Sequence, residues 1–212
     1  MKNLKSYQEF IFEDIQNIED KKILNNIIEW VYGKSDRMKI DSIARFLNSN
    51  LSKIKDLSKI KPEIYQSPLG EVCYRGLEKI SNVEEVIDIM NKGLYKVTKA
   101  PGYEGFIKAI EINNYDYSPR RLAQSWSIDP DVAWRFANTG IILETQIDSN
   151  FIMNPKYMSE LNKSINKSGS SSGLAEDEVI HLGKSYKNVT LFIDLNSIEK
   201  GNPIYPYIKK LI

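Results

Sequence analysis

The sequence predicts a mixed α+β fold with a helical N-terminal layer. Apolar residues recur at helical spacing over the first 60 or so positions, and short apolar segments separated by turns follow from Val72 onward. The chain has 212 residues, 42% hydrophobic and 27% charged, so it can bury a sizeable core and has the composition of a globular protein. We therefore expect a helical segment over residues 1–66 and a β-rich domain over residues 67–212, packed as one compact unit.

The N-terminal segment contains three stretches with helical periodicity. The first begins at Ser6 and Glu9, a residue pair typical of a capping box. A short basic helix is expected in "LSKIKDLSKIK", ending before Pro62 because proline interrupts the backbone hydrogen bonds of a helix. The apolar positions are Phe10, Ile11, Ile15 and Ile18 in the first stretch, Ile23, Leu24, Ile27, Ile28 and Val31 in the second, and Met38, Ile40, Ile43, Ala44 and Leu47 in the third.

The β-rich part is predicted from seven segments with two helices among them. The helix in "DPDVAWRFANTG" is marked by Asp129 at the N-cap and Pro130 at the first helical position, and the other helix is expected in "NVEEVIDIMNKG". The run from Asn162 to Gly173 is rich in Ser and Gly, which predicts a flexible loop. The strand segments are "EVCYRGLE", "GLYKVTKA", "RLAQSWSI", "GIILETQI", "DEVIHLG", "VTLFIDL" and "PIYPYIKKLI".

Charge and composition narrow the classes of function. The net charge of +1 comes from 29 basic and 28 acidic residues, so no overall field directs the chain to nucleic acid or to an anionic membrane. One cysteine, Cys73, and one histidine, His181, cannot form a disulfide within the chain or a Cys/His zinc site. Neither a signal peptide nor an apolar run of membrane-spanning length is present, so we expect a cytoplasmic protein. A metal is not expected, since the sequence offers no Cys/His cluster.

Three short motifs carry groups suited to chemistry. In "YRG", Arg75 precedes Gly76, and its planar guanidinium suits bidentate binding of a phosphate. In "SWS", strand alternation puts Ser125 and Ser127 on one face and Trp126 on the other. Taken singly, each has a more ordinary explanation: a surface arginine and a polar corner between a strand and a helix.

The third motif is "EDE", which precedes the strand segment "VIHL". Glu176 and Glu178 fall on the same face of a strand entrance, about 6 to 7 Å apart, whereas Asp177 points elsewhere. An acidic strand edge often serves only solubility. Two carboxylates at this spacing, together with an arginine and two serines, could also stabilise the positive charge that develops at an anomeric carbon when its bond to a leaving group breaks.

In their order along the chain, these motifs resemble the arginine-serine-glutamate class of mono-ADP-ribosyltransferases. The resemblance rests on "CYRG", "SWSIDPDVAWRFA" and "SGSSSGLAEDEVI" and covers about residues 70 to 205. With the helical leader, the chain looks most like the small ADP-ribosyltransferases encoded by bacteriophages. The resemblance implies a split β-sandwich core that binds NAD+ as co-substrate and modifies a host protein in the host cytoplasm.

It also implies a role for each motif residue. Arg75 and Gly76 would bind the phosphates of NAD+, Ser125 would orient the catalytic glutamate, and Ser127 would line the nicotinamide ribose pocket. Glu178 would stabilise the oxocarbenium ion formed as nicotinamide leaves.

The resemblance also implies which residues recognise the acceptor, the group that receives ADP-ribose. Glu176 would orient or deprotonate the nucleophile, and a glutamate at this position goes with arginine acceptors in relatives. Leu174 stands where many relatives have an aromatic residue in the acceptor-recognition loop, here residues 168 to 175. Arginine is the expected target.

Three alternatives stay open. The same site could act as an NAD+ glycohydrolase with water as acceptor, or it could modify a nucleic acid. From another class, the chain could be a catalytically inactive phage inhibitor that binds a host complex through its helices. For His181 and Cys73, structural positions in the core are the favoured interpretation.

Overall fold

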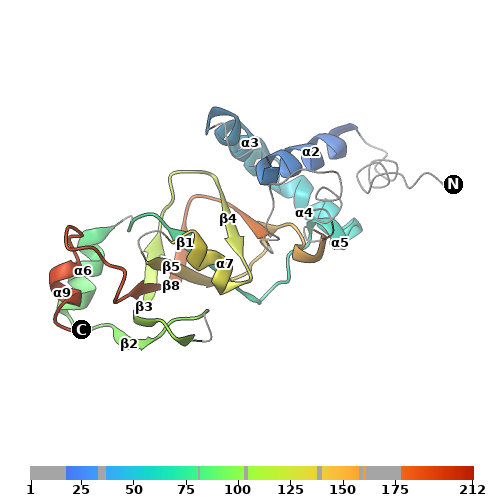
Figure 1. Ribbon diagram of the computed structural model, residues 1–212. Helices are drawn as coiled ribbons and strands as arrows, with labels where there is room; N and C mark the ends of the chain where they lie inside the picture. The colour runs from blue at the N-terminus through green and yellow to red at the C-terminus, as the bar shows by residue number, and fades with distance from the viewer. Residues whose placement is uncertain are drawn as a thin grey trace. The chain divides into compact units, whose positions relative to one another are not determined.

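The computed structural model describes residues 18–32, 37–80, 82–102, 105–137, 140–157, 160 and 178–212 (Figure 1). The fold is mixed α+β, and the strand pairs of these residues are antiparallel. The chain divides into two compact units. The first takes its residues from Met1–Leu69, Arg121–Ser125 and Asp148–Gly183, and the second takes its residues from Gly70–Arg120, Trp126–Ile147 and Lys184–Ile212.

The first unit begins with the predicted helices. They are α2 (Ile18–Tyr32), α3 (Arg37–Ser49), α4 (Leu51–Ile60) and α5 (Pro62–Tyr65), drawn in blue to cyan in Figure 1. As expected, α4 ends before Pro62. This proline then opens α5, where its missing N–H leaves no hydrogen bond unmade. The stretch predicted as a helix from Ser6 to Ile18 lies outside the described residues except for Ile18, which begins α2.

These helices bury their apolar faces against strands of the same unit. The strands are β6 (Phe151–Ile152), β7 (Glu178–Leu182) and the first three residues of β4 (Ala123–Ser127). The Gly183 amide donates to the Leu122 carbonyl at 2.7 Å, so the start of β4 lies beside the end of β7. The shared core includes Ile23, Leu24, Ile27, Trp30, Ile40, Ile43, Ala44, Leu47, Ile54, Ala123, Ile152, Ile180 and Leu182.

The two compact units are each made of non-contiguous segments, whereas the sequence predicts two contiguous parts, residues 1–66 and residues 67–212. The helices share one apolar cluster with strand residues that come much later in the sequence, such as Ala123 and Ile180. Periodicity locates the apolar face of a helix but does not identify its partner, which explains the difference.

The second unit is built on six strands in the order β2-β3-β8-β5-β1-β4. Here β4 contributes only Trp126 and Ser127, because its earlier residues belong to the first unit. The bounds of the other strands are Val72–Leu77 for β1, Lys96–Lys99 for β2, Lys108–Tyr117 for β3, Ile141–Gln146 for β5 and Tyr186–Asp194 for β8.

Helix α7 (Pro130–Arg135) packs on β1 and β5, as Figure 1 shows. It begins as predicted, because the Asp129 carboxylate accepts a hydrogen bond from the Asp131 amide at 2.8 Å and Pro130 occupies the first turn. The approach to β1 is very close at Gly76, where an added Cβ would lie 2.3 Å from the Ala133 carbonyl oxygen. Gly76 therefore sets the distance between helix and strand.

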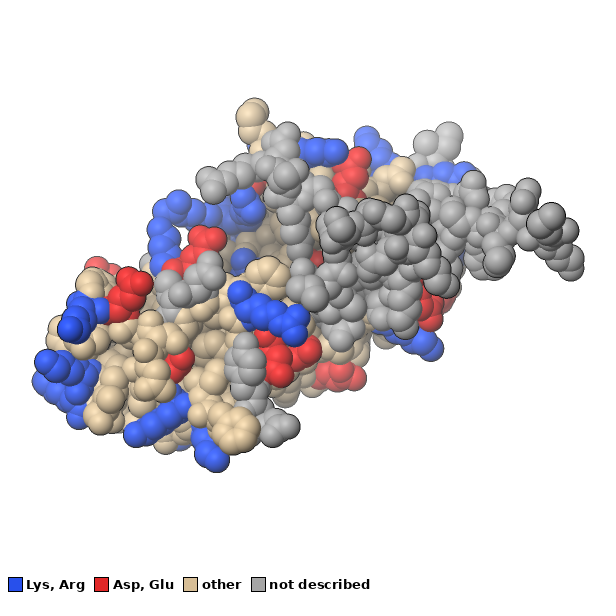
Figure 2. Space-filling model, in the orientation of Figure 1, with Lys and Arg blue, Asp and Glu red and all other residues tan. Residues whose placement is uncertain are grey.

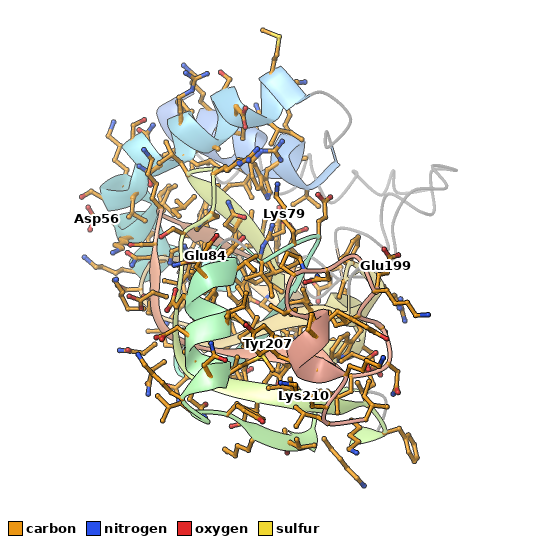
Figure 3. The ribbon with its side chains drawn as sticks, turned by 90° about the vertical axis from the view of Figure 1, so that its left-hand side faces the viewer. Asp56, Lys79, Glu84, Glu199, Tyr207 and Lys210 are labelled. Carbon is orange, nitrogen blue, oxygen red and sulfur yellow. The ribbon has the colours of Figure 1, made fainter. Side chains whose placement is uncertain are left out.

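Helices α6 (Val83–Asn91) and α9 (Tyr205–Ile208) lie side by side in Figures 1 and 3. The predicted α6 is capped by Asn82, whose side chain accepts from the Glu85 amide. The segment "PIYPYIKKLI" was expected to be a strand, and this prediction is wrong, because its centre is the helical turn α9. Ile204 and Ile208 are both fully buried and stand four residues apart, which is a helical spacing, and Pro206 supplies the first turn.

Two strands were missed from the sequence. In β3, Asn113 and Asn114 interrupt the apolar alternation, and Asn114 has a positive φ of 59° where the register with β8 shifts. Such an asparagine pair is more typical of a turn than of a strand. The other missed strand, β6, has only two residues and carries no periodic signal.

Candidate functional site

Glu178 opens β7 in the first unit and is only 2% exposed. Glutamate is rarely buried to this degree unless other groups stabilise its charge or bind its proton, so this position needs specific neighbours. Glu176, Leu174 and the loop over residues 168 to 175 lie outside the described residues. Glu178 is therefore the one residue of the acidic motif whose position the structure describes.

Ser125 lies on the same face of the first unit as Glu178. Strand alternation groups Ala123 with Ser125 on β4, and Glu178 with Ile180 on β7. Because Ala123 and Ile180 pack in one apolar cluster with the helices, both strands direct this face toward them. The serine and the glutamate of the predicted site thus share one face of two neighbouring strands.

A hydrogen bond from a helix reaches Ser125. The indole Nε1–H of Trp30, in α2, donates to the Ser125 hydroxyl oxygen at 3.1 Å. Trp30 is only 4% exposed and belongs to the same apolar cluster. Sequence reasoning missed Trp30, because no local pattern indicates that its N–H bonds a serine 95 positions away.

His181 lies on the opposite side of β7 from Glu178, since the two residues are three apart in a strand. It is 4% exposed, and its ring meets the Phe151 ring edge-on with centroids 4.6 Å apart. Burial lowers the pKa of His181 to about 4, against a smaller opposite effect from Asp148. His181 is therefore a neutral histidine in the core at neutral pH, as the sequence analysis favours.

In the second unit, β1 and β4 bring the "YRG" and "SWS" motifs next to each other. Tyr74 of β1 and Ser127 of β4 are Cα partners. Because the two strands are antiparallel, Arg75, the residue after Tyr74, lies opposite Trp126, the residue before Ser127. On its other side, Arg75 pairs with Leu143 of β5. Alternation puts Arg75 on the face opposite to Tyr74, so the residue directly across from Ser127 is the tyrosine of the motif.

Ser127 is 5% exposed and joins β4 to α7. Its hydroxyl oxygen accepts a hydrogen bond from the Asp129 amide at 3.0 Å. Since Asp129 caps α7, the serine stabilises the corner between the strand and the helix.

Trp126 is buried, as the sequence predicts, and bonds a residue that the motifs did not indicate. Its indole N–H donates to the Tyr186 hydroxyl at 3.0 Å, and the two ring centroids are 4.9 Å apart. Burial holds the pKa of Tyr186 well above its ordinary value, while the hydrogen bond from Trp126 and the charge of Arg75 act in the opposite direction. Cys73 is likewise fully buried, in keeping with a place in the core.

Glu144 and Glu111 share the sheet face that carries Tyr74. Glu144 is the β5 partner of Tyr74, and burial followed by the charge of Glu111 raises its pKa. Burial alone would also raise the pKa of Glu111, but hydrogen bonds from Lys96 and Asn113 hold it below the ordinary value. The Lys96 ammonium is 2.6 Å from a Glu111 carboxylate oxygen.

The predicted site residues therefore fall into two groups. Ser125 and Glu178 share one face of neighbouring strands in the first unit. Arg75, Gly76 and Ser127 belong to neighbouring strands of the second unit, with Arg75 on the sheet face opposite to that of Ser127. Within the described part of the chain, no group of three or more His, Cys, Asp or Glu side chains is placed to hold a metal ion. On the face drawn in Figure 2, basic and acidic side chains alternate without a large area of one sign.

Comparison with protein families, curated proteins and solved structures gave no match for this chain. Among the described residues, no helix combines the length and the apolar character needed to cross a membrane.

Proposed function

We propose that this chain is a mono-ADP-ribosyltransferase that cleaves NAD+ and transfers ADP-ribose to an arginine of a host protein. The observation that carries the proposal is the burial of Glu178 at the first position of β7, on the face that also holds Ser125. A carboxylate held away from water is a strong stabiliser of a cation that forms beside it, because its charge is poorly screened.

In the proposed reaction, the bond between the nicotinamide nitrogen and the ribose anomeric carbon breaks. Its electron pair leaves with neutral nicotinamide, and the ribose becomes an oxocarbenium ion, which Glu178 stabilises. An arginine nitrogen of the target then forms the new bond to the anomeric carbon, and Glu176 takes the proton that this nitrogen loses. No metal takes part in either step.

The remaining motif residues bind and orient NAD+. Arg75 would bind the phosphates through its guanidinium fork, with Gly76 allowing α7 to pack closely behind the strand. Ser125 would orient Glu178, and Ser127 would line the nicotinamide ribose pocket. The proposal includes the finer fold that the resemblance implies, a split β-sandwich.

The test uses purified protein, labelled NAD+ and bacterial lysate. We expect label on specific protein bands, removed by neutral hydroxylamine if the linkage is to arginine, and release of nicotinamide. Glu178→Gln should abolish both while the protein stays folded by circular dichroism. Glu199→Gln is the control, because this glutamate is exposed (Figure 3). Full activity of Glu178→Gln would refute the assignment.

The same assay separates the alternatives. Nicotinamide release without labelled protein indicates a glycohydrolase, and label on nucleic acid indicates a different acceptor. If the wild-type protein neither releases nicotinamide nor transfers label, the proposal fails and the alternative of an inactive binding protein is favoured.

A further inference from the structure

We infer that Trp30 is a positioning residue for Ser125, so that the N-terminal helices form part of the catalytic apparatus as well as the core. This inference rests on the proposed function. It starts from the hydrogen bond of 3.1 Å between the Trp30 indole N–H and the Ser125 hydroxyl oxygen. All of its residues lie in the first unit.

The hydrogen bond determines whether Ser125 is the donor or the acceptor toward Trp30. An indole N–H is a donor only, so the Ser125 oxygen must be the acceptor in this contact. The hydroxyl is therefore left to act as a donor through its own proton, which points away from Trp30. A carboxylate can accept such a hydrogen bond, and Glu178 lies on the same face of the neighbouring strand.

The indole is itself rigidly held. Trp30 is 4% exposed and packs with Ile27, Ala123, Ile180 and Leu182 in one cluster. Because that cluster joins α2 to both β4 and β7, the position of the indole nitrogen is fixed relative to each strand. The strand that carries Ser125 and the strand that carries Glu178 thus share one helical support.

The arrangement distinguishes two roles for the helices. A mere cover for the sheet would require only apolar side chains on α2. A positioning role requires in addition a donor aimed at Ser125, which Trp30 supplies and Phe would not. Trp30→Phe is therefore the informative substitution, since it keeps an aromatic ring and removes the donor.

The experiment measures nicotinamide release for the wild type, Trp30→Phe, Ser125→Ala and the double variant. We expect Trp30→Phe to lower kcat by about fivefold, the effect of one hydrogen bond, with little change in the KM for NAD+. The double variant should be no slower than Ser125→Ala, because both substitutions break the same link. Ile27→Val is the matched control, as it removes one methyl group from the same core and keeps the bond.

The outcomes separate this inference from the proposed function. If the wild type releases no nicotinamide, both fail. If the wild type is active and Trp30→Phe has an unchanged kcat, or if its effect multiplies with that of Ser125→Ala, only the inference fails. A kcat loss in Ile27→Val equal to that in Trp30→Phe would also overturn it, since reduced packing alone would then explain the result.

Discussion

A Cβ atom on Gly76 would lie 2.3 Å from the backbone carbonyl oxygen of Ala133. It would also lie 2.7 Å from the Ala137 amide nitrogen. Backbone atoms of α7 cannot rotate away as a flexible side chain could, so the helix and β1 would have to separate. The glycine of the "YRG" motif thus has a packing role that is independent of any ligand.

Gly76→Ala should therefore destabilise the protein by about 1–3 kcal/mol, the range for inserting a methyl group into a packed core. Urea unfolding followed by circular dichroism measures this. Gly201→Ala is the control, because an added Cβ there meets no atom within 4 Å. Equal unfolding midpoints for the two variants would show that α7 does not pack against Gly76 this closely in solution.

Acidification should weaken the fold through His181. Its pKa is about 4 in the native state, mainly because of burial, against an ordinary value of 6.5. Between these values the unfolded chain binds a proton that the native protein does not, so stability falls as the pH falls from about 6.5 toward 4. We expect the free energy of unfolding to drop by about 2 kcal/mol between pH 7 and pH 5.

His181→Gln tests the source of that pH dependence. Because His181 is the single histidine of the sequence, the variant should show a much flatter stability profile from pH 7 to pH 5. An unchanged slope would mean that other groups cause it.

Glu144 and Glu111 should respond oppositely to loss of charge. The native pKa of Glu144 is raised, first by burial and then by Glu111, so ionisation above pH 4.5 costs stability. Glu144→Gln should raise the urea midpoint at pH 7, and the gain should vanish below pH 4.5. The native pKa of Glu111 is lowered despite burial, so its ionised form stabilises the fold.

Glu111→Gln is accordingly the matched comparison for Glu144→Gln. It should lower the urea midpoint at pH 7, and the loss should shrink at high salt, which screens the pair with Lys96. A decrease in stability for both variants would contradict the assigned pKa directions.

The sequence predicts most local elements of this fold, because local elements depend on periodicity and capping. Helices α2 and α3 follow from the apolar spacing, α4 follows from the basic segment before Pro62, and α7 follows from Asp129 and Pro130. The C-terminal segment was predicted as a strand because tyrosine and isoleucine favour strands. It forms a helical turn, in which the spacing of Ile204 and Ile208 allows both to be buried. Strand β3 was not predicted, because Asn113 and Asn114 interrupt its apolar alternation. They lie where the register with β8 shifts, which the sequence of β3 alone does not indicate.

The candidate site residues can be proposed from the sequence motifs, but the residues that hydrogen-bond to those motifs cannot. Arg75, Ser125 and Glu178 stand out by chemical type and order. Trp30 and Tyr186 do not, since their hydrogen bonds cross large sequence separations and nothing local to either residue indicates a partner. The pairing of Tyr74 with Ser127 depended on strand register, which alternation alone does not determine.

The discontinuous core of the first unit also bears on synthesis. Helices α2 to α4 are synthesised before Ile152, Ile180 and Leu182, which complete their apolar cluster. Until then the helices expose surface that has no native partner, a state prone to association with other chains. We expect nascent chains that stop before β7 to need a chaperone.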